Sequence, residues 1–343
     1  MELTLIVVAV AGLLLGRLSA GWSAVMLRDW YSGGLLNCLN CGAEVAPSVR
    51  WFRPLPIRCE CGARKICWHL GSAIGLSMLF TGFTWLMINT DCQGLEEVRP
   101  ALPNLYARLP FHLFLIFLLW TATVTDLLDY MIPDLIVLIG IVVAVLAATV
   151  TGDLQMIHIW VNWDDVIPGV QGPYLPQWIK DHQHLHGLAW SLSGLLCGSA
   201  FTWIVRHLSG WILGYPALGS GDVTLMAMVG AFIGWQPVLC SLALAPIAGL
   251  VVGLLVRVFQ GRSFVAFGPY LAVSTVVVIG TWRWIWVDYF RMRIIFSHWP
   301  SVVGLVGVAL GSLFVLLLGL RLFRSIPVET RRSKSDPERN ENQ

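Results

Sequence analysis

The sequence predicts an all-α fold, a polytopic transmembrane helical bundle, and three features of its composition point to it. Of the 343 residues, 57% are hydrophobic and only 12% are charged, whereas soluble domains carry about 25% charged residues. The 17 Trp and 33 Gly residues also suit a bilayer protein, in which aromatic side chains lie at the interfaces and glycine lets helices approach closely. A basic surface interleaved with aromatic residues is absent from the sequence, which argues against a nucleic-acid partner. The lipid bilayer is therefore the predicted partner of most of the chain.

About nine apolar runs are long enough to cross a bilayer, for which a helix needs about 20 residues. They cover residues 3–24, 70–90, 110–128, 134–151, 188–207, 222–239, 240–257, 268–287 and 301–322. The first run lacks the positively charged segment of a secretory signal, so we expect a retained transmembrane helix. The division within 222–257 rests only on the stretch Gly234-Trp235-Gln236-Pro237.

The placement of Lys and Arg predicts which loops face the cytoplasm. The segment 28–69 holds six basic residues, and the C-terminal tail holds another group that falls on the same side if there are nine spans. The sequence then divides into a first span at 1–27, a cytoplasmic cysteine-rich loop at 28–69, a transmembrane core at 70–322 and a disordered cytoplasmic tail at 323–343.

The cysteine-rich loop has the composition of a small metal site. Cys38, Cys41, Cys59, Cys61 and Cys67 lie within thirty residues. The first two have the spacing of a zinc knuckle, and the Cys59–Cys61 pair is one residue shorter than that spacing. Because structural zinc takes four tetrahedral ligands, we expect Cys38, Cys41 and Cys61 to bind it together with either Cys59 or Cys67. The alternative is a loop of reduced thiols without metal.

Two carboxylates stand out because each lies where a predicted span meets the cytoplasmic face. Asp126 lies at the end of the span 110–128, and Asp222 opens the span 222–239 from the same side. Charged residues at span ends are costly unless they have a function or reach water. Two carboxylates that share one proton act together as base and acid, which suits peptide hydrolysis. The alternative for either residue alone is an ordinary interfacial aspartate.

The residues around this pair fit a site for a peptide substrate. Gly219 and Gly221 leave no side chain beside Asp222, so a substrate backbone has room to approach. Pro133 breaks the connection after Asp126 and exposes that end of the helix. Asp126 and Asp222 are therefore the candidate catalytic residues, and Gly219, Gly221 and Pro133 are the candidate substrate-binding residues.

Several motifs in a fixed order give the sequence a more specific resemblance. Asp126 lies seven residues before Pro133 in an Ile-Pro-Asp turn, and the run Gly219–Asp222 follows later. After that run come Leu225, Ala227, Gly230, Ala231, Gly234 and Trp235, and then the stretch Phe267-Gly268-Pro269-Tyr270-Leu271-Ala272. Together with the cysteine-bearing loop after the first span, this order resembles the type IV prepilin peptidase family, membrane aspartic peptidases of the Gly-x-Gly-Asp type. The resemblance covers roughly residues 1–285.

The resemblance implies a multi-pass peptidase of the bacterial inner membrane with Asp126 and Asp222 as its catalytic pair. It implies hydrolysis after the Gly of a prepilin or pseudopilin leader at the cytoplasmic face. It also implies methylation of the new N-terminus with S-adenosylmethionine, if that second family activity is retained. The chain departs from the family pattern at Pro216, where the family usually has Glu, and at Thr224, where it usually has Lys.

Three other readings remain open. A degenerate homologue would keep the fold as a scaffold without catalysis, and the changes at Pro216 and Thr224 are compatible with it. An ion-coupled transporter would use the acidic residues to bind ions, but transporters place such residues near the bilayer midplane and often show inverted repeats. A preflagellin-type peptidase is disfavoured by the cysteine-rich loop.

Overall fold

The computed structural model describes residues 2–30, 68–95, 98, 102–160, 176–260 and 267–325. Over these ranges the chain is helical and forms no β-strand beyond one isolated bridge between Leu95 and Val98. The predicted all-α class is therefore confirmed. All five predicted zinc ligands lie outside the described residues, and so does most of the tail.

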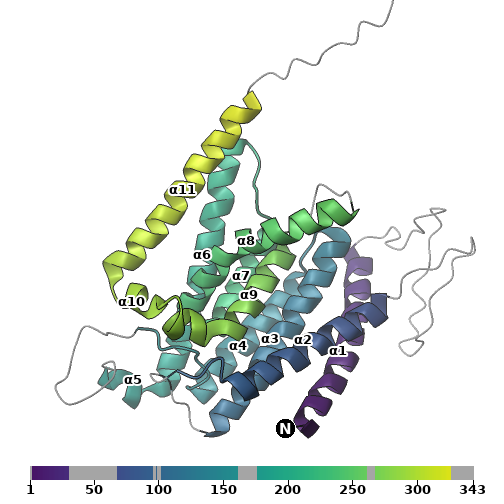
Figure 1. The fold of residues 1–343 in the computed structure, drawn as a ribbon, viewed down its shortest axis with the longest axis vertical. Coiled ribbons are helices and arrows are strands. Elements are labelled where there is room, and N and C mark those ends of the chain that lie inside the picture. Colours follow the sequence, from purple (N-terminus) through teal and green to yellow (C-terminus); the bar gives the residue numbers. More distant parts are fainter. Residues whose placement is uncertain are drawn as a thin grey trace, which may run out of the picture.

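Figure 1 shows the arrangement of the helical elements. They are α1 (Glu2–Trp30), α2 (Trp68–Thr90), α3 (Leu102–Asp129), α4 (Asp134–Thr151), α5 (Gln177–Asp181), α6 (Gln183–Leu213), α7 (Ser220–Ile233), α8 (Trp235–Gln260), α9 (Gly268–Arg283), the π-helical turn η1 (Trp284–Asp288), α10 (Met292–Phe296) and α11 (Trp299–Ser325).

Seven of the described helices are long and apolar enough to cross a membrane, which confirms a multi-pass membrane protein. These stretches are Glu2–Ser23, Leu70–Thr90, Ala107–Leu127, Asp134–Thr151, Gln183–Leu213, Gly268–Asp288 and Trp299–Leu322. The two remaining predicted spans correspond to α7 and α8, whose apolar parts Ser220–Ile233 and Trp235–Val251 are shorter. The expected count of about nine spans is therefore not confirmed.

The boundary between the sixth and seventh predicted spans was wrong by several residues. The sequence placed it between 239 and 240, whereas α7 ends at Ile233 and α8 begins at Trp235. Gly234 between them has φ 82° and ψ 173°, a backbone conformation that residues with a side chain rarely adopt. A Cβ at Gly234 would also overlap the indole of Trp190. The helix therefore breaks at Gly234, the first residue of the stretch Gly234-Trp235-Gln236-Pro237 that was the only sign of a division in the sequence.

Contacts between helix ends establish that α9 runs antiparallel to α3 and in the same direction as α2. The N–H of Gly268 at the start of α9 donates to Asp126 near the end of α3. At the opposite end of α9, the N–H of Arg283 donates to the carbonyl of Cys92, just after α2. Near the end of α6, Arg206 bonds Leu218 just before α7, and Ile132 after α3 lies against Gly221 of α7. The ends of α3 and α6 and the starts of α7 and α9 therefore lie at one end of the bundle, the upper end in Figure 1.

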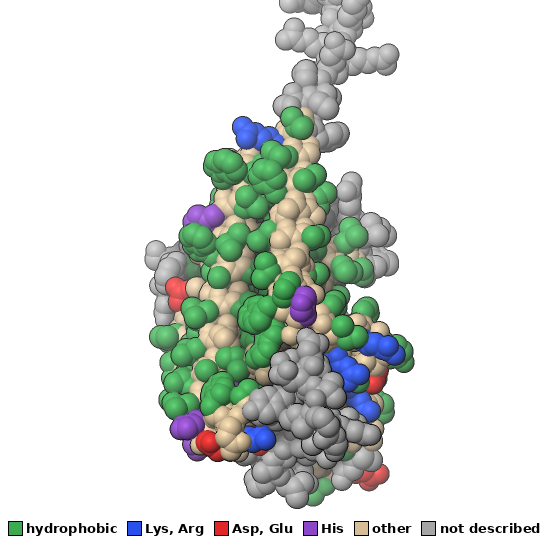
Figure 2. Space-filling model, turned by 90° about the vertical axis from the view of Figure 1, so that its left-hand side faces the viewer, with side chains coloured by type: hydrophobic (Ala, Val, Ile, Leu, Met, Phe, Trp, Pro, Cys, Tyr) green, Lys and Arg blue, Asp and Glu red, His purple; other side chains and the backbone are tan. Residues whose placement is uncertain are grey.

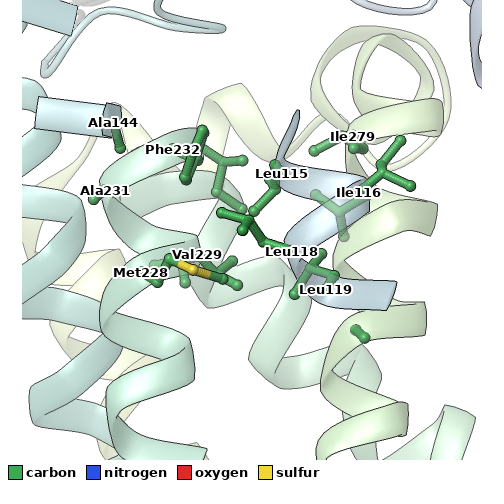
Figure 3. Packing of buried hydrophobic residues seen from close by; sticks show 14 of the residues in the cluster. Leu115, Ile116, Leu118, Leu119, Ala144, Met228, Val229, Ala231, Phe232 and Ile279 are labelled. Carbon is green, nitrogen blue, oxygen red and sulfur yellow. The ribbon is translucent and has the colours of Figure 1, made fainter. Parts of the chain in front are cut away.

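Helix α7 lies at the centre of the bundle, and every residue from Leu225 to Ile233 is buried. Its side chains pack against α3, where Phe232 lies 4.7 Å from Phe111 between ring centroids. Figure 3 shows this core, with Met228, Val229 and Phe232 of α7 beside Leu115, Leu118 and Leu119 of α3. A helix that is apolar on all sides is expected to be surrounded by other helices.

Glycine residues allow α6 to approach α7 at backbone distance. A Cβ at Gly194 would overlap the carbonyl oxygen of Gly230 and lie 2.7 Å from its carbonyl carbon. A Cβ at Gly230 would in turn overlap the carbonyl oxygen of Gly194. Ser191 adds a hydrogen bond of 2.8 Å from its hydroxyl to the carbonyl of Ala231. Small residues and such bonds are the usual means of helix association in lipid, where the hydrophobic effect contributes little.

The outer surface is apolar along its middle, as a bilayer requires. In Figure 2 hydrophobic side chains cover most of the visible face, and Lys and Arg side chains lie toward its two ends. The most exposed apolar side chains include Leu196 and Trp211 of α6 and Val308 and Leu316 of α11. Only 11% of the most apolar window of α11 is buried in the protein, so this helix presents most of its surface to lipid.

The close contact between α6 and α7 leads to a test of the packing. Gly194→Ala should lower the stability of the protein by about 1–3 kcal/mol, because the added methyl group forces two backbones apart. Gly82→Ala is the matched control, since a Cβ there meets nothing within 4 Å and alanine favours the helix. Thermal unfolding in detergent measures both variants. Equal stabilities would contradict the backbone contact.

Candidate active site

The local sequence ends α3 just after Asp126 and turns the chain toward α4. The N–H of Tyr130 still bonds the carbonyl of Asp126, at 2.9 Å, but Tyr130 has φ 53° and cannot continue a helix. Pro133 follows as the N-cap residue of α4, with φ −68° and ψ 126°. The result is a short turn at the end of the bundle, in which the side chain of Asp126 is 6% exposed.

Asp222 lies in the first turn of α7, where its carboxylate holds the start of the helix. Its Oδ2 accepts a hydrogen bond of 2.8 Å from the N–H of Gly219, the N-cap residue. A negative charge in the first turn is also favoured by the helix dipole. The side chain is 7% exposed. Asp222 therefore has a structural role as a helix cap beside any chemical one.

Asp126 is held in the same way by a different helix. Its Oδ2 accepts the N–H of Gly268 at 3.0 Å. A Cβ at Gly268 would overlap that oxygen and lie 3.2 Å from Cγ of Asp126, so only glycine fits this position. Gly268 belongs to the sequence motif Phe267–Ala272, which marked this stretch but gave no indication of its contact with Asp126.

The side chain of Ile132 connects the three helix ends that form the site. A Cβ at Gly221 would lie 3.0 Å from Cβ of Ile132, and a Cβ at Gly268 would lie 3.4 Å from its Cδ1. The turn after α3 therefore packs onto the starts of both α7 and α9. This arrangement brings Asp126 close enough to Asp222 for the two carboxylates to repel each other electrostatically. Two carboxylates at such a distance favour a state in which they share one proton.

The three candidate substrate-binding residues have distinct surroundings. A Cβ at Gly219 would lie 3.4 Å from the Oδ2 of Asp222, so a side chain there would touch the carboxylate. Ile132 fills the space beside Gly221, so the lack of a side chain at Gly221 serves helix packing. Pro133 is half-buried in the turn itself.

Sequence reasoning missed Arg206, a basic residue of α6 that reaches the site. Its Nη1 donates to the carbonyl of Leu218 at 2.5 Å, in the loop that leads to α7. Ser209, one turn further along α6, accepts the N–H of Ala217 at 2.9 Å. Arg206 also attracts the Asp222 carboxylate electrostatically. In sequence, an arginine within an apolar run looks like an interfacial residue, and its contact with a distant loop is not visible.

Within the described ranges, no group of three or more His, Cys, Asp or Glu side chains is able to hold a metal ion. Cys92, Cys197 and Cys240 are free thiols there. The zinc site predicted at Cys38, Cys41, Cys59, Cys61 and Cys67 lies outside the described residues, so it stays a prediction.

The fold and the site together define a multi-pass membrane protein with a pair of buried aspartates where three helix ends meet. Comparison with known proteins agrees with this class. Residues 113–254 match the model of the type IV leader peptidase family, which confirms the resemblance over that region. The matched region includes Asp126, Arg206 and Asp222, whereas Gly268 and the cysteine-rich loop lie outside it.

Curated relatives carry one shared name, prepilin leader peptidase/N-methyltransferase. The protein from Escherichia coli (strain K12) is 31% identical over 106 residues, which is 30% of this chain and 44% of the relative. The protein from Pseudomonas aeruginosa PAO1 is 34% identical over 95 residues, 26% of this chain and 33% of the relative. The protein from Pseudomonas putida is 29% identical over 168 residues, 47% of each chain. The chain thus matches less than half the length of these relatives. No solved structure matches it.

The close contact between Gly268 and Asp126 can be tested by a double-mutant cycle. Gly268→Ala should lower stability, because its methyl group overlaps the carboxylate. Asp126→Ala removes that overlap, so the double variant should lose less stability than the sum of the two single variants. We expect a coupling of about 1–3 kcal/mol, the range for residues in direct contact. Thermal unfolding in detergent measures it, and strictly additive losses would refute the contact.

Proposed function

We propose that this chain is a membrane-embedded aspartic endopeptidase that cleaves the leader of type IV prepilin-like or pseudopilin substrates after Gly. The observation that carries the proposal is the pairing of Asp126 and Asp222, two nearly buried carboxylates that interact electrostatically at one end of the bundle. Their position within the region that matches the leader peptidase family supports it. The placement of Lys and Arg supports a cytoplasmic location of this end in the bacterial inner membrane.

The pair is suited to general acid and base catalysis of peptide hydrolysis. The ionised carboxylate accepts a proton from a water molecule as the water oxygen attacks the scissile carbonyl carbon. The protonated carboxyl group gives its proton to the carbonyl oxygen, which forms a tetrahedral diol. A proton then returns from the diol to one carboxylate while the other protonates the departing nitrogen. The C–N bond breaks, and one water has been consumed for one new carboxyl and one new amino group.

The geometry of the site also supports the kind of substrate. A short basic leader would stay at the cytoplasmic face, while the apolar helix that follows it would lie in the bilayer beside the spans. The bond between them then lies at the depth of Asp126 and Asp222. A side chain at Gly219 would lie in van der Waals contact with the Asp222 carboxylate, so the glycine leaves the approach to this carboxylate open to a substrate backbone.

The alternatives account for fewer of these observations. An ion-coupled transporter would bind its ion near the bilayer midplane, whereas Asp126 and Asp222 lie in the last turn and the first turn of their helices. A degenerate scaffold would not need both carboxylates, yet both are present and each is held by a glycine N–H.

The catalytic roles can be tested by isosteric substitutions. Asp126→Asn and Asp222→Asn should each abolish cleavage of a prepilin-like peptide in detergent or liposomes, with a loss of at least about 100-fold. Asparagine keeps the shape, and its oxygen still accepts the glycine N–H, but it does not titrate. Asp134→Asn is the matched control, because Asp134 is exposed at the start of α4 and should keep wild-type activity.

The outcomes separate the three readings. Cleavage near the wild-type rate in either Asn variant would show that the assignment of the pair is wrong. A folded wild-type protein without cleavage would favour the scaffold. Ion uptake into liposomes that depends on Asp126 or Asp222 would favour the transporter.

We extend the proposal to the methyl transfer in the names of the relatives. If this chain retains it, S-adenosylmethionine would be the methyl donor and the new N-terminus the acceptor. Transfer of labelled methyl groups to the cleaved product measures this activity separately from cleavage, and the two activities need not fall together in the Asn variants.

We also propose that the loop 28–69 binds one structural zinc ion through Cys38, Cys41, Cys61 and either Cys59 or Cys67. Elemental analysis of protein purified without chelator should find one zinc per chain. Cys38→Ser should lower the zinc content without abolishing cleavage, since the predicted metal is structural. A wild-type preparation free of zinc would rule the site out.

A further inference from the structure

We infer that Arg206 is a positioning residue of the active site, which acts on Asp222 through the peptide group between Leu218 and Gly219. The inference rests on the proposed function, because it assigns a role within the catalytic pair. It also assigns the two aspartates different roles, with Asp222 as the ionised base and Asp126 as the protonated acid.

One peptide group joins Arg206 to Asp222. Its carbonyl oxygen, on Leu218, accepts from Nη1 of Arg206 at 2.5 Å. Its N–H, on Gly219, donates to Oδ2 of Asp222 at 2.8 Å. The guanidinium and the carboxylate thus lie at the two ends of a chain of two hydrogen bonds with an amide between them.

These two linked hydrogen bonds favour a negative charge on Asp222. A cation at the carbonyl polarises the amide, which makes its N–H a stronger donor toward the carboxylate. Bonds with an ionised partner are also about twice as strong as those between neutral groups. The direct electrostatic attraction of Arg206 acts in the same direction.

The two aspartates differ in the groups that surround their carboxylates. Asp126 is held by the N–H of Gly268, and the carbonyl of that peptide group, on Phe267, accepts backbone N–H groups of Tyr270 and Leu271 instead of a cation. Within the described residues, the charged groups that face Asp222 are Arg206 from α6 and Asp126 from α3. When one proton is shared by the pair, it therefore resides on Asp126.

The length of α6 places Arg206 beside the loop that precedes α7. The helix has 31 residues and is about 46 Å long, which exceeds the apolar core of a bilayer of about 30 Å. Its last turns carry Arg206 and Ser209 along the loop, and both side chains bond loop backbone groups. Thr224, one turn inside α7, uses its hydroxyl to bond the carbonyl of Gly221 and brings no charge to the site.

The test compares three variants by the pH dependence of kcat/KM. Arg206→Gln removes the charge, so ionised Asp222 should be harder to form and the acidic limb of the profile should move up by about one pH unit. That shift is a loss of about tenfold on the acidic side, with activity recovered at higher pH. Arg206→Lys keeps the charge and should leave the limb near its wild-type position. Ser209→Ala loosens the same loop without changing charge, so it should lower activity without moving the limb.

An acidic limb that stays in place in Arg206→Gln, while Asp126→Asn and Asp222→Asn are inactive, would overturn the role of Arg206 and leave the proposed function intact. A limb that moves equally in Ser209→Ala would also overturn it, because loop geometry alone would then explain the effect. Infrared titration of the protonated carboxyl band needs no catalysis, with Asp222→Asn to assign the band. In wild type the band of Asp222 should disappear at a lower pH than in Arg206→Gln, and equal titrations would contradict the inference even if no substrate is cleaved.

Discussion

The backbone contact between α6 and α7 is the constraint on which the rest of the site depends. Gly194 and Gly230 let the two helices meet without intervening side chains. Because α7 has only 14 residues and is surrounded by other helices, its start cannot move independently of that contact. The contact therefore fixes the position of Asp222 and aligns the last turns of α6 with the loop that precedes α7. Arg206 bonds this loop from the last turns of α6.

The contribution of α9 to the site is equally indirect. Its first residue, Gly268, supplies a backbone N–H to Asp126, and its far end is attached to the end of α2 through Arg283 and Cys92. The side chain of Ile132 then fills the space between the starts of α7 and α9. An apolar side chain thus sets the separation of two helix ends, and the aspartates take their places as a consequence.

The sequence predicted the membrane bundle because long apolar runs and few charges are properties of composition. It also predicted that Asp126 and Asp222 share one end of the bundle, since alternating spans place their helix ends on the same side. The stretch that begins at Gly234 was recognised as the only break between two spans, but hydropathy does not report backbone conformation, so the boundary itself was placed too late, at 239/240. Nor does hydropathy report which helix ends touch, so the roles of Gly268 and Arg206 had to come from the structure. A glycine whose N–H holds a carboxylate looks, in sequence, like any other glycine at a helix start.

Two carboxylates near a bilayer are costly to ionise, and the arrangement of helix ends offsets part of that cost. The starts of α7 and α9 both direct a backbone N–H at an aspartate, and helix starts carry partial positive charge. Asp126 also lies near the C-terminal end of α3, where the helix dipole carries partial negative charge. Its carboxylate is therefore stabilised less than that of Asp222. Asp222 lies at the start of its helix and receives the influence of Arg206 as well. The helix ends that bring the two aspartates together thus stabilise the ionised form of Asp222 more than that of Asp126. A base and an acid that work together need this difference, because one must be ionised while the other holds the proton.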